Sequence, residues 1–88
     1  MKTIQAILTL DMENLPANFQ EILQQEQAIV AEWKANGIIN HLYLREERNG
    51  AVLLFNNISE DEVKVLMEKL PFFAISKKIE YLKLIQQF

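Results

Sequence analysis

Glu26 is the residue of this 88-residue sequence best placed for acid–base chemistry. The apolar residues of segment 16–36 recur with helical spacing, and Glu26 falls at the centre of their stripe, between Ile22 and Val30. A carboxylate there is costly unless it is neutralised, hydrogen-bonded or open to a wet pocket. Desolvation raises the pKa of a carboxyl group, which suits a general acid or base near neutral pH. The alternative is a structural glutamate held by a tyrosine, a backbone amide or a basic side chain.

A second set of polar side chains lies on segment 38–45, which reads as a strand. Alternation places His41 and Tyr43 on one face together with Ile39 and Arg45. This face is either the wall of a polar pocket, with His41 as a second catalytic candidate and Tyr43 and Arg45 as substrate-binding candidates, or a group of satisfied structural residues. The strand pattern leaves open whether His41 faces the helix of Glu26 or the opposite side of the sheet.

Two aromatic residues complete the candidate substrate-binding set. Trp33 lies on the apolar stripe of segment 16–36, where packing in the core is the main expectation. Phe73 follows a second helix together with Phe72. This pair is a candidate for core, dimer contact or pocket lid, and core is the favoured interpretation.

The composition excludes several other kinds of site. One histidine and no cysteine exclude multi-histidine and thiolate metal sites, disulfides and a cysteine nucleophile. The sequence has no glycine-rich phosphate loop. Its formal net charge of −3 offers no basic surface for nucleic acid or an anionic membrane. No apolar run is long enough to span a membrane, and the lack of cysteine suits a cytoplasmic protein.

The elements that must position these residues begin with a strand and a long helix. Residues 3–10 alternate between apolar and polar side chains, which predicts a strand with one strongly apolar face. Segment 16–36 is predicted to be helical, with Pro16 in its first turn. Asn36-Gly37 is expected to end the helix, because glycine readily adopts the left-handed conformation of a C-terminal cap.

Segments 38–45 and 51–55 are predicted to form a β-hairpin. Asn49-Gly50 between two apolar runs favours a type I′ turn, which needs positive φ at both positions. Segment 51–55 is apolar at every position, so both faces of that strand are expected to be buried.

A short helix and a last strand complete the chain. Ser59 and Glu62 form a capping box at the start of the helix, and Pro71 closes it. Residues 78–85 then alternate as a strand.

This order of elements predicts a single α+β domain over residues 1–88. A βαββαβ chain of this length folds most simply as a ferredoxin-like plait, a four-stranded antiparallel sheet with two helices on one face. The other face would expose apolar surface in a monomer. We therefore expect a homodimer in which two sheets stack on one another.

Four features recur in a fixed order between residues 26 and 84. They are Glu26 in the first helix, Asn36-Gly37 at its end, His41-Leu42-Tyr43 in the next strand, and Leu70-Pro71-Phe72-Phe73 before the last strand. In this series the chain resembles the muconolactone isomerase family, which has similar His-Leu-Trp and Leu-Pro-Leu-Phe segments. The sequence departs from the family at Leu44, where the family has an arginine, and at Ala74-Ile75, where it has Pro-Tyr.

The resemblance implies ferredoxin-like subunits that pair into dimeric α/β barrels. It also implies a proton shift in an unsaturated lactone during aromatic breakdown, without cofactor or metal. Glu26 would then carry the proton, and His41 and Tyr43 would line the pocket. Two function classes stay open: such an isomerase, or a non-catalytic dimer of the same fold that binds a small molecule or is purely structural. The polar content around Glu26 discriminates them, because an enzyme needs donors that stabilise an enolate.

Overall fold

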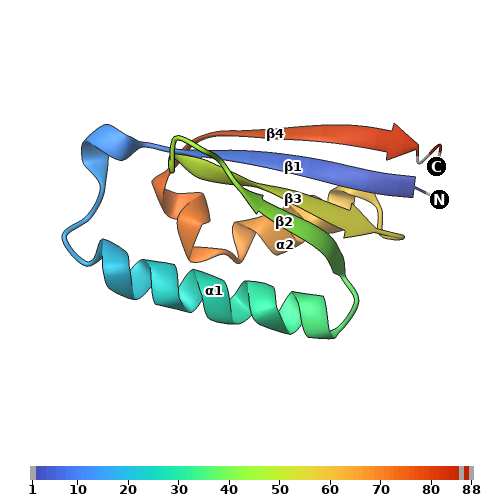
Figure 1. Ribbon diagram of the computed structural model, residues 1–88, viewed down its shortest axis with the longest axis horizontal. Helices are drawn as coiled ribbons and strands as arrows, with labels where there is room; N and C mark the ends of the chain where they lie inside the picture. Colours follow the sequence, from blue (N-terminus) through green and yellow to red (C-terminus); the bar gives the residue numbers. More distant parts are fainter. Residues whose placement is uncertain (1, 86, 88) are drawn as a thin grey trace.

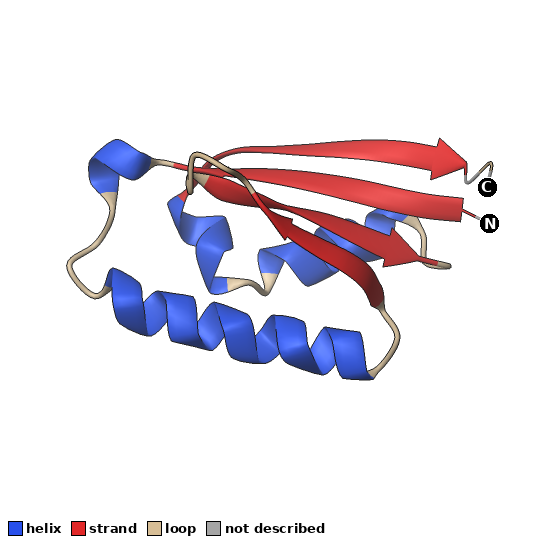
Figure 2. Ribbon diagram, viewed as in Figure 1, coloured by secondary structure: helices blue, strands red, loops and turns tan. Residues whose placement is uncertain are grey.

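The computed structural model describes residues 2–85 and 87 and has a four-stranded antiparallel sheet with two α-helices on one face (Figure 1). The strand order is β2-β3-β1-β4, and Figure 2 shows both helices on the same side of the strands. The elements are β1 Lys2–Leu10, η1 Met12–Asn14, α1 Phe19–Ala35, β2 Ile39–Leu44, β3 Gly50–Asn56, α2 Glu60–Glu68, η2 Pro71–Ile75 and β4 Ser76–Ile85, where η1 and η2 are 3-10 helices. The predicted α+β ferredoxin-like plait is confirmed.

The core lies between the two helices and the central strands β1 and β3. Alternate residues of β1 face the helices, and each of these is at most 5% exposed: Ile4, Ala6, Leu8 and Leu10. Their antiparallel partners on β3 include Leu53 and Phe55, which are also buried. The apolar alternation of the two strands therefore supplies one wall of the core, as the sequence predicted.

Helix α1 begins later than predicted and ends as predicted. Its first residue is Phe19, because the backbone around Pro16 forms a separate turn in which the Phe19 N–H donates to the Pro16 carbonyl oxygen. At its end, Gly37 adopts φ 73°, and the Ile38 N–H donates to the Trp33 carbonyl oxygen. This pattern is a Schellman motif. Among the described residues no helix is both long and apolar enough to cross a membrane.

The β2–β3 hairpin forms, but its turn is different from the predicted one. The turn residues are Glu46 and Glu47, closed by a hydrogen bond from the Arg48 N–H to the Arg45 carbonyl oxygen. Arg48, not Asn49, has the positive φ that follows this turn. The predicted type I′ turn at Asn49-Gly50 is therefore wrong, because a longer loop with a left-handed residue after the turn joins the strands.

A register shift in β2 changes which side chains share a face. Ile39 pairs with Phe55, whereas His41 pairs with Leu54, so one extra residue is inserted at Asn40. Without this β-bulge, Ile39 would lie on the same face as His41. With it, Ile39 is buried towards the helices while His41 lies on the other side of the sheet. The prediction that Ile39 shares a face with His41 is therefore wrong.

Helix α2 and the turn after it follow the predicted signals closely. The Ser59 hydroxyl accepts a 3.1 Å hydrogen bond from the Glu62 N–H, which confirms the N-terminal cap. Pro71 ends the helical run and begins η2, in which Phe72 is 7% exposed and Phe73 is 40% exposed. Strand β4 starts at Ser76, two residues earlier than expected.

The sheet face away from the helices is called the open face here. The strand register places on it Thr3, Gln5, Ile7, Thr9, His41, Tyr43, Val52, Leu54, Asn56, Lys78, Glu80, Leu82 and Leu84. Val52 and Leu54 are half-buried by their neighbours, whereas Tyr43, Leu82 and Leu84 are exposed. In the single chain, β3 is fully buried only on the face towards the helices. The predicted burial of its open face by a second copy stays a prediction.

Candidate active site

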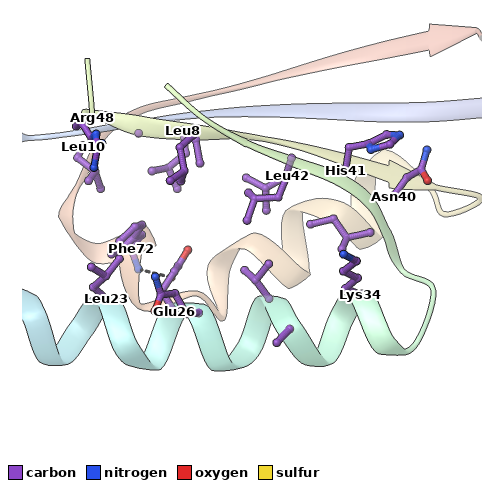
Figure 3. Close-up of a pocket in the computed structure, with 18 of the residues that line it drawn as sticks. Leu8, Leu10, Leu23, Glu26, Lys34, Asn40, His41, Leu42, Arg48 and Phe72 are labelled. Carbon is purple, nitrogen blue, oxygen red and sulfur yellow. Dashed lines mark hydrogen bonds between the residues drawn. The ribbon is translucent and has the colours of Figure 1, made fainter. Parts of the chain in front are cut away.

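A cavity of about 770 Å³ lies between α1 and the helix-facing side of the sheet (Figure 3). Its walls are mainly apolar and include Leu8, Leu23, Val30, Leu42 and Leu53. The residues with polar side chains that line it are Glu26, Gln27, Lys34, Asn40, His41 and Arg48. A cavity of this size, with a few polar groups in an apolar wall, is typical of a small-molecule site.

Glu26 is the acidic residue of this cavity, and one of its two oxygens is anchored. The side chain is 7% exposed, and Oε1 accepts a 3.1 Å hydrogen bond from the backbone N–H of Phe72 (Figure 3). The other oxygen, Oε2, has no hydrogen-bond partner within residues 2–85. The Phe72 amide therefore fixes the carboxyl group and leaves one oxygen available to a bound molecule.

Burial raises the pKa of Glu26 from 4.5 to about 7, because the apolar surroundings disfavour the charged carboxylate. The hydrogen bond from Phe72 acts in the opposite direction and is the smaller effect. A carboxyl group with this pKa is present in both its neutral and its charged form near neutral pH. It can accept a proton and return it within the same reaction.

The position of Glu26 in the middle of an apolar stripe has a structural reason. Helical periodicity places Leu23 and Val30 on one side of it, and these residues line the cavity. The same periodicity places Ile22 and Trp33 on the other side, where they pack in the core. The stripe therefore serves both the core and the cavity, and Glu26 lies at the boundary between them.

His41 contributes to the cavity lining, but its imidazole ring does not face Glu26. Its pairing with Leu54 puts the imidazole on the open face, where the ring stacks on Tyr43 with 5.9 Å between centroids. In Figure 3 the ring lies on the side of β2 away from α1. His41 therefore faces the side of the sheet opposite to the helix of Glu26, which the strand pattern left open. Glu26 has no direct contact with this histidine.

The four predicted substrate-binding residues lie outside the cavity lining. Tyr43 is 55% exposed on the open face, and an Arg45 guanidinium nitrogen donates a 2.7 Å hydrogen bond to the Thr9 hydroxyl oxygen. Trp33 is buried against the ring of Phe55. Phe73 points away from the core, and its neighbour Phe72 lines the cavity in its place.

Two basic cavity residues, Lys34 and Arg48, were missing from the sequence-based candidates, and the contact of Phe72 with Glu26 was not predicted. Phe72 stacks on Phe19 at 5.8 Å and also supplies the amide that binds Glu26, which no spacing rule relates to a residue 46 positions away. Lys34 projects from the last turn of α1 towards β2, and Arg48 reaches the cavity from the hairpin turn (Figure 3). A basic residue beside a turn gives no signal in the sequence that it will line a cavity.

The arrangement is suited to acid–base chemistry on a small organic molecule. It combines one carboxyl group of raised pKa with mainly apolar walls and two basic side chains. Within the described residues no group of three or more histidine, cysteine or acidic side chains is arranged to hold a metal ion.

No protein-family model and no curated protein matches the sequence. Solved structures do match it over nearly the whole chain. The crystal structure of muconolactone isomerase has a TM-score of 0.74 at 21% identity and covers 97% of this chain and 90% of its own. The dehydrochlorinase for 5-chloro-2-hydroxyhydroquinone from Burkholderia phenoliruptrix AC1100, in complex with 2,5-dihydroxybenzoquinone, has a TM-score of 0.66 at 14% identity, covering 96% and 94%.

A hypothetical protein from Pyrococcus horikoshii is also similar, with a TM-score of 0.53, 10% identity and coverage of 99% and 93%. At these identities the likeness concerns the fold. The resemblance predicted from the sequence is confirmed at that level: the chain has the fold of muconolactone isomerase.

Proposed function

We propose that this protein is a small cofactor-independent isomerase that shifts a proton in an unsaturated lactone or a similar carbonyl compound. Glu26 is the acid–base group of the proposed reaction. The observation that carries the proposal is a single buried carboxyl group with a pKa of about 7, anchored at one oxygen and facing an apolar cavity.

In the proposed reaction, the Glu26 carboxylate removes a proton from the carbon next to the substrate carbonyl. The electron pair of that C–H bond moves into the conjugated system and gives an enolate. The neutral Glu26 then returns the proton to the far carbon of that system, so the double bond shifts and the overall composition is unchanged. A proton carrier with a pKa near the working pH serves both steps.

The structural neighbours support this reaction class. One is named as an isomerase of a lactone, and another as a dehydrochlorinase that binds a dihydroxybenzoquinone. Both names denote enzymes that act on small oxygenated molecules of the size this cavity admits. We therefore place the substrate in the breakdown of aromatic compounds, and the lack of cysteine suits work in the cytoplasm.

The test is proton exchange catalysed by the purified protein with a panel of unsaturated lactones in deuterated water. We expect the wild type to move the double bond and to incorporate deuterium at the far carbon that receives the proton, both detected by NMR. Glu26→Gln should reduce the rate by at least about a hundredfold, since general acid–base groups contribute about this much. The control is Glu32→Gln, which changes an exposed glutamate of the same helix.

If the wild type binds lactones without exchanging a proton, the isomerase proposal fails. The alternative, a non-catalytic small-molecule-binding dimer of the same fold, would then be favoured. Equal rates in the wild type and Glu26→Gln would show that Glu26 is not the group that moves the proton.

We further propose that the protein forms a homodimer through the open face. The apolar side chains of this face include Val52 and Leu54 on β3, Ile7 beside Val52 on β1, and Leu82 on β4, with Gln5 between Leu54 and Leu82. Of its charged side chains, Lys78 and Glu80 form an ion pair with each other at 3.5 Å, and Arg45 donates a hydrogen bond to the Thr9 hydroxyl. A face with exposed apolar side chains and mostly paired charges can bind a second copy of itself about a two-fold axis.

A further inference from the structure

Phe72 contacts helix α1 through its ring and through its backbone, at places two helical turns apart. The ring stacks on Phe19, with 5.8 Å between the ring centroids and 10° between the ring planes. The backbone N–H donates the 3.1 Å hydrogen bond to Glu26 Oε1. Phe19 precedes Glu26 by seven residues, so both lie on the same side of the helix, about 10.5 Å apart along its axis. The two contacts together fix where the Phe72 amide lies relative to the carboxyl group.

The N–H of Phe72 is available to Glu26 because it is a free donor at the start of η2. Pro71, the first residue of η2, has no N–H. The N–H of Phe73 donates to the Leu70 carbonyl oxygen and closes the first turn. The Phe72 N–H lies between them and, like the first donors of any helix, needs a partner from elsewhere. At its start, η2 therefore meets α1 through this hydrogen bond and the stacked rings.

The hydrogen bond acts on the Glu26 carboxyl group in two ways. It restricts the orientation of the carboxyl plane, because Oε1 must face the Phe72 amide. It also favours the charged form, so it lowers the pKa of Glu26, which burial raises. In the neutral acid Oε1 is the carbonyl oxygen, since an oxygen that carries a proton is the weaker acceptor. The proton is then carried on Oε2, which this hydrogen bond leaves free.

We propose that Phe19 and Phe72 are positioning residues: the stacking of their rings holds the Phe72 N–H against Glu26 Oε1 and so fixes the carboxyl group that carries the proton. The inference rests on the proposed function in taking Glu26 as the group that moves the proton. Neither ring takes part in the proton transfer. Both act through the backbone amide of Phe72, which links the packing of η2 on α1 to the orientation of the carboxyl group in the cavity.

The experiment measures the pKa of Glu26, by NMR titration of its carboxyl carbon, and the hydrogen exchange of the Phe72 amide, both without substrate. Phe19→Leu keeps an apolar side chain in the cavity wall but removes the flat ring on which Phe72 stacks. We expect it to weaken the hydrogen bond, so that the pKa of Glu26 rises from its wild-type value by about 0.5 or more. The Phe72 amide should exchange about tenfold faster or more.

The direction of the change separates this role from a looser cavity. Entry of water around Glu26 would lower its pKa, whereas loss of the N–H donor raises it. Phe19→Tyr keeps the ring and should restore the wild-type pKa and amide exchange. A pKa that falls or stays unchanged in Phe19→Leu would overturn the proposal.

A double-mutant cycle tests whether the two rings act together. Phe72→Leu removes the other ring of the stack and should raise the pKa of Glu26 as Phe19→Leu does. Because the stack can be lost only once, the double variant should raise the pKa no further than either single variant. Additive increases would show that the rings act separately, and they would overturn the proposal.

Trp33→Phe is the matched control for altered aromatic packing on the same helix. Trp33 follows Glu26 by seven residues, as Phe19 precedes it by seven, and its ring contacts Phe55 with 5.8 Å between centroids. We expect this variant to lower the thermal stability but to keep the wild-type pKa of Glu26 and exchange of the Phe72 amide. A pKa increase equal to that of Phe19→Leu would contradict the positioning role.

The outcome is independent of catalysis, because no substrate is present. A protein in which Phe19→Leu raises the pKa of Glu26, but which exchanges no proton with lactones, would uphold the role of the rings and refute the isomerase. A protein that isomerises lactones, but whose Glu26 has the same pKa in the wild type and Phe19→Leu, would uphold the isomerase and refute the positioning role.

Discussion

At the scale of single residues, Glu26 links the stability of the protein to its proposed acid–base role. The carboxyl group is surrounded by apolar side chains and has one hydrogen bond, from the Phe72 amide. Neutral Glu26 fits this environment, whereas the charged form lacks the solvation it has in the unfolded chain. The folded protein therefore holds a proton at pH values where the unfolded chain has released it.

This imbalance predicts a pH-dependent loss of stability. The pKa of Glu26 is about 7 in the folded state and 4.5 ordinarily, so its contribution to the free energy of unfolding falls as the pH rises from 4.5 to 7. The fall amounts to about 3 kcal/mol. Glu26→Gln has no such group, so it should gain stability relative to the wild type by this amount between pH 5 and pH 8.

Urea unfolding of both proteins across this pH range provides the measurement. Glu26→Leu should show the same trend and should exceed the wild type in stability at pH 8, since it fills the stripe with apolar volume. If the curves of wild type and Glu26→Gln run parallel, Glu26 titrates normally and its acid–base role is refuted.

At the scale of elements, two glycines determine how the strands and helix α1 join. At Gly50, a Cβ atom would collide with the backbone carbonyl oxygen of Leu8 on the neighbouring strand. This oxygen belongs to the paired backbone of the sheet, which has no flexible group that can move aside. At Gly37, a Cβ would meet no atom within 4 Å, and the constraint there is its φ of 73°.

The two positions should therefore respond differently to alanine. Gly37→Ala should lower the free energy of unfolding by about 1–2 kcal/mol, the cost of a left-handed conformation. Gly50→Ala should cost about 3 kcal/mol, because it also forces β1 and β3 apart. Denaturant unfolding compares them directly, and an equal cost at both positions would contradict the close approach of Leu8.

At the scale of the whole molecule, the sheet has one face covered by the helices and one open face. Leu53 and Leu54 are neighbours on β3, but Leu53 is 2% exposed in the core and Leu54 lies on the open face. A charge at either position meets an apolar environment in the proposed dimer. A charge at Leu53 would disrupt the core of the chain, whereas a charge at Leu54 would disrupt the contact between the two chains.

We expect Leu54→Lys to produce a folded monomer and Leu53→Lys to unfold the chain. Sedimentation equilibrium of the wild type should report about twice the 10.3 kDa chain mass at micromolar concentration. Leu54→Lys should report the chain mass itself and keep its circular dichroism spectrum. A wild-type protein that is a stable monomer at this concentration would refute the dimer.

The sequence by itself determined the features that depend on neighbouring residues. The alternation of β1, the glycine end of α1 and the Ser59 cap each require contacts within a few positions along the chain, and each is confirmed. The place of Glu26 on the apolar stripe follows from helical periodicity in the same way.

Only the tertiary structure decided which side chains meet at the cavity. The Asn40 bulge turns His41 to the open face, because Ile39 packs in the core and Leu42, an odd number of residues further on, pairs with Leu53 and lines the cavity on the same side of the sheet. The packing of η2 against α1 selects Phe72 rather than Phe73 and brings its amide to Glu26, 46 residues away. Strand register and packing between residues so far apart depend on the whole fold, so the local spacing of residues does not predict them.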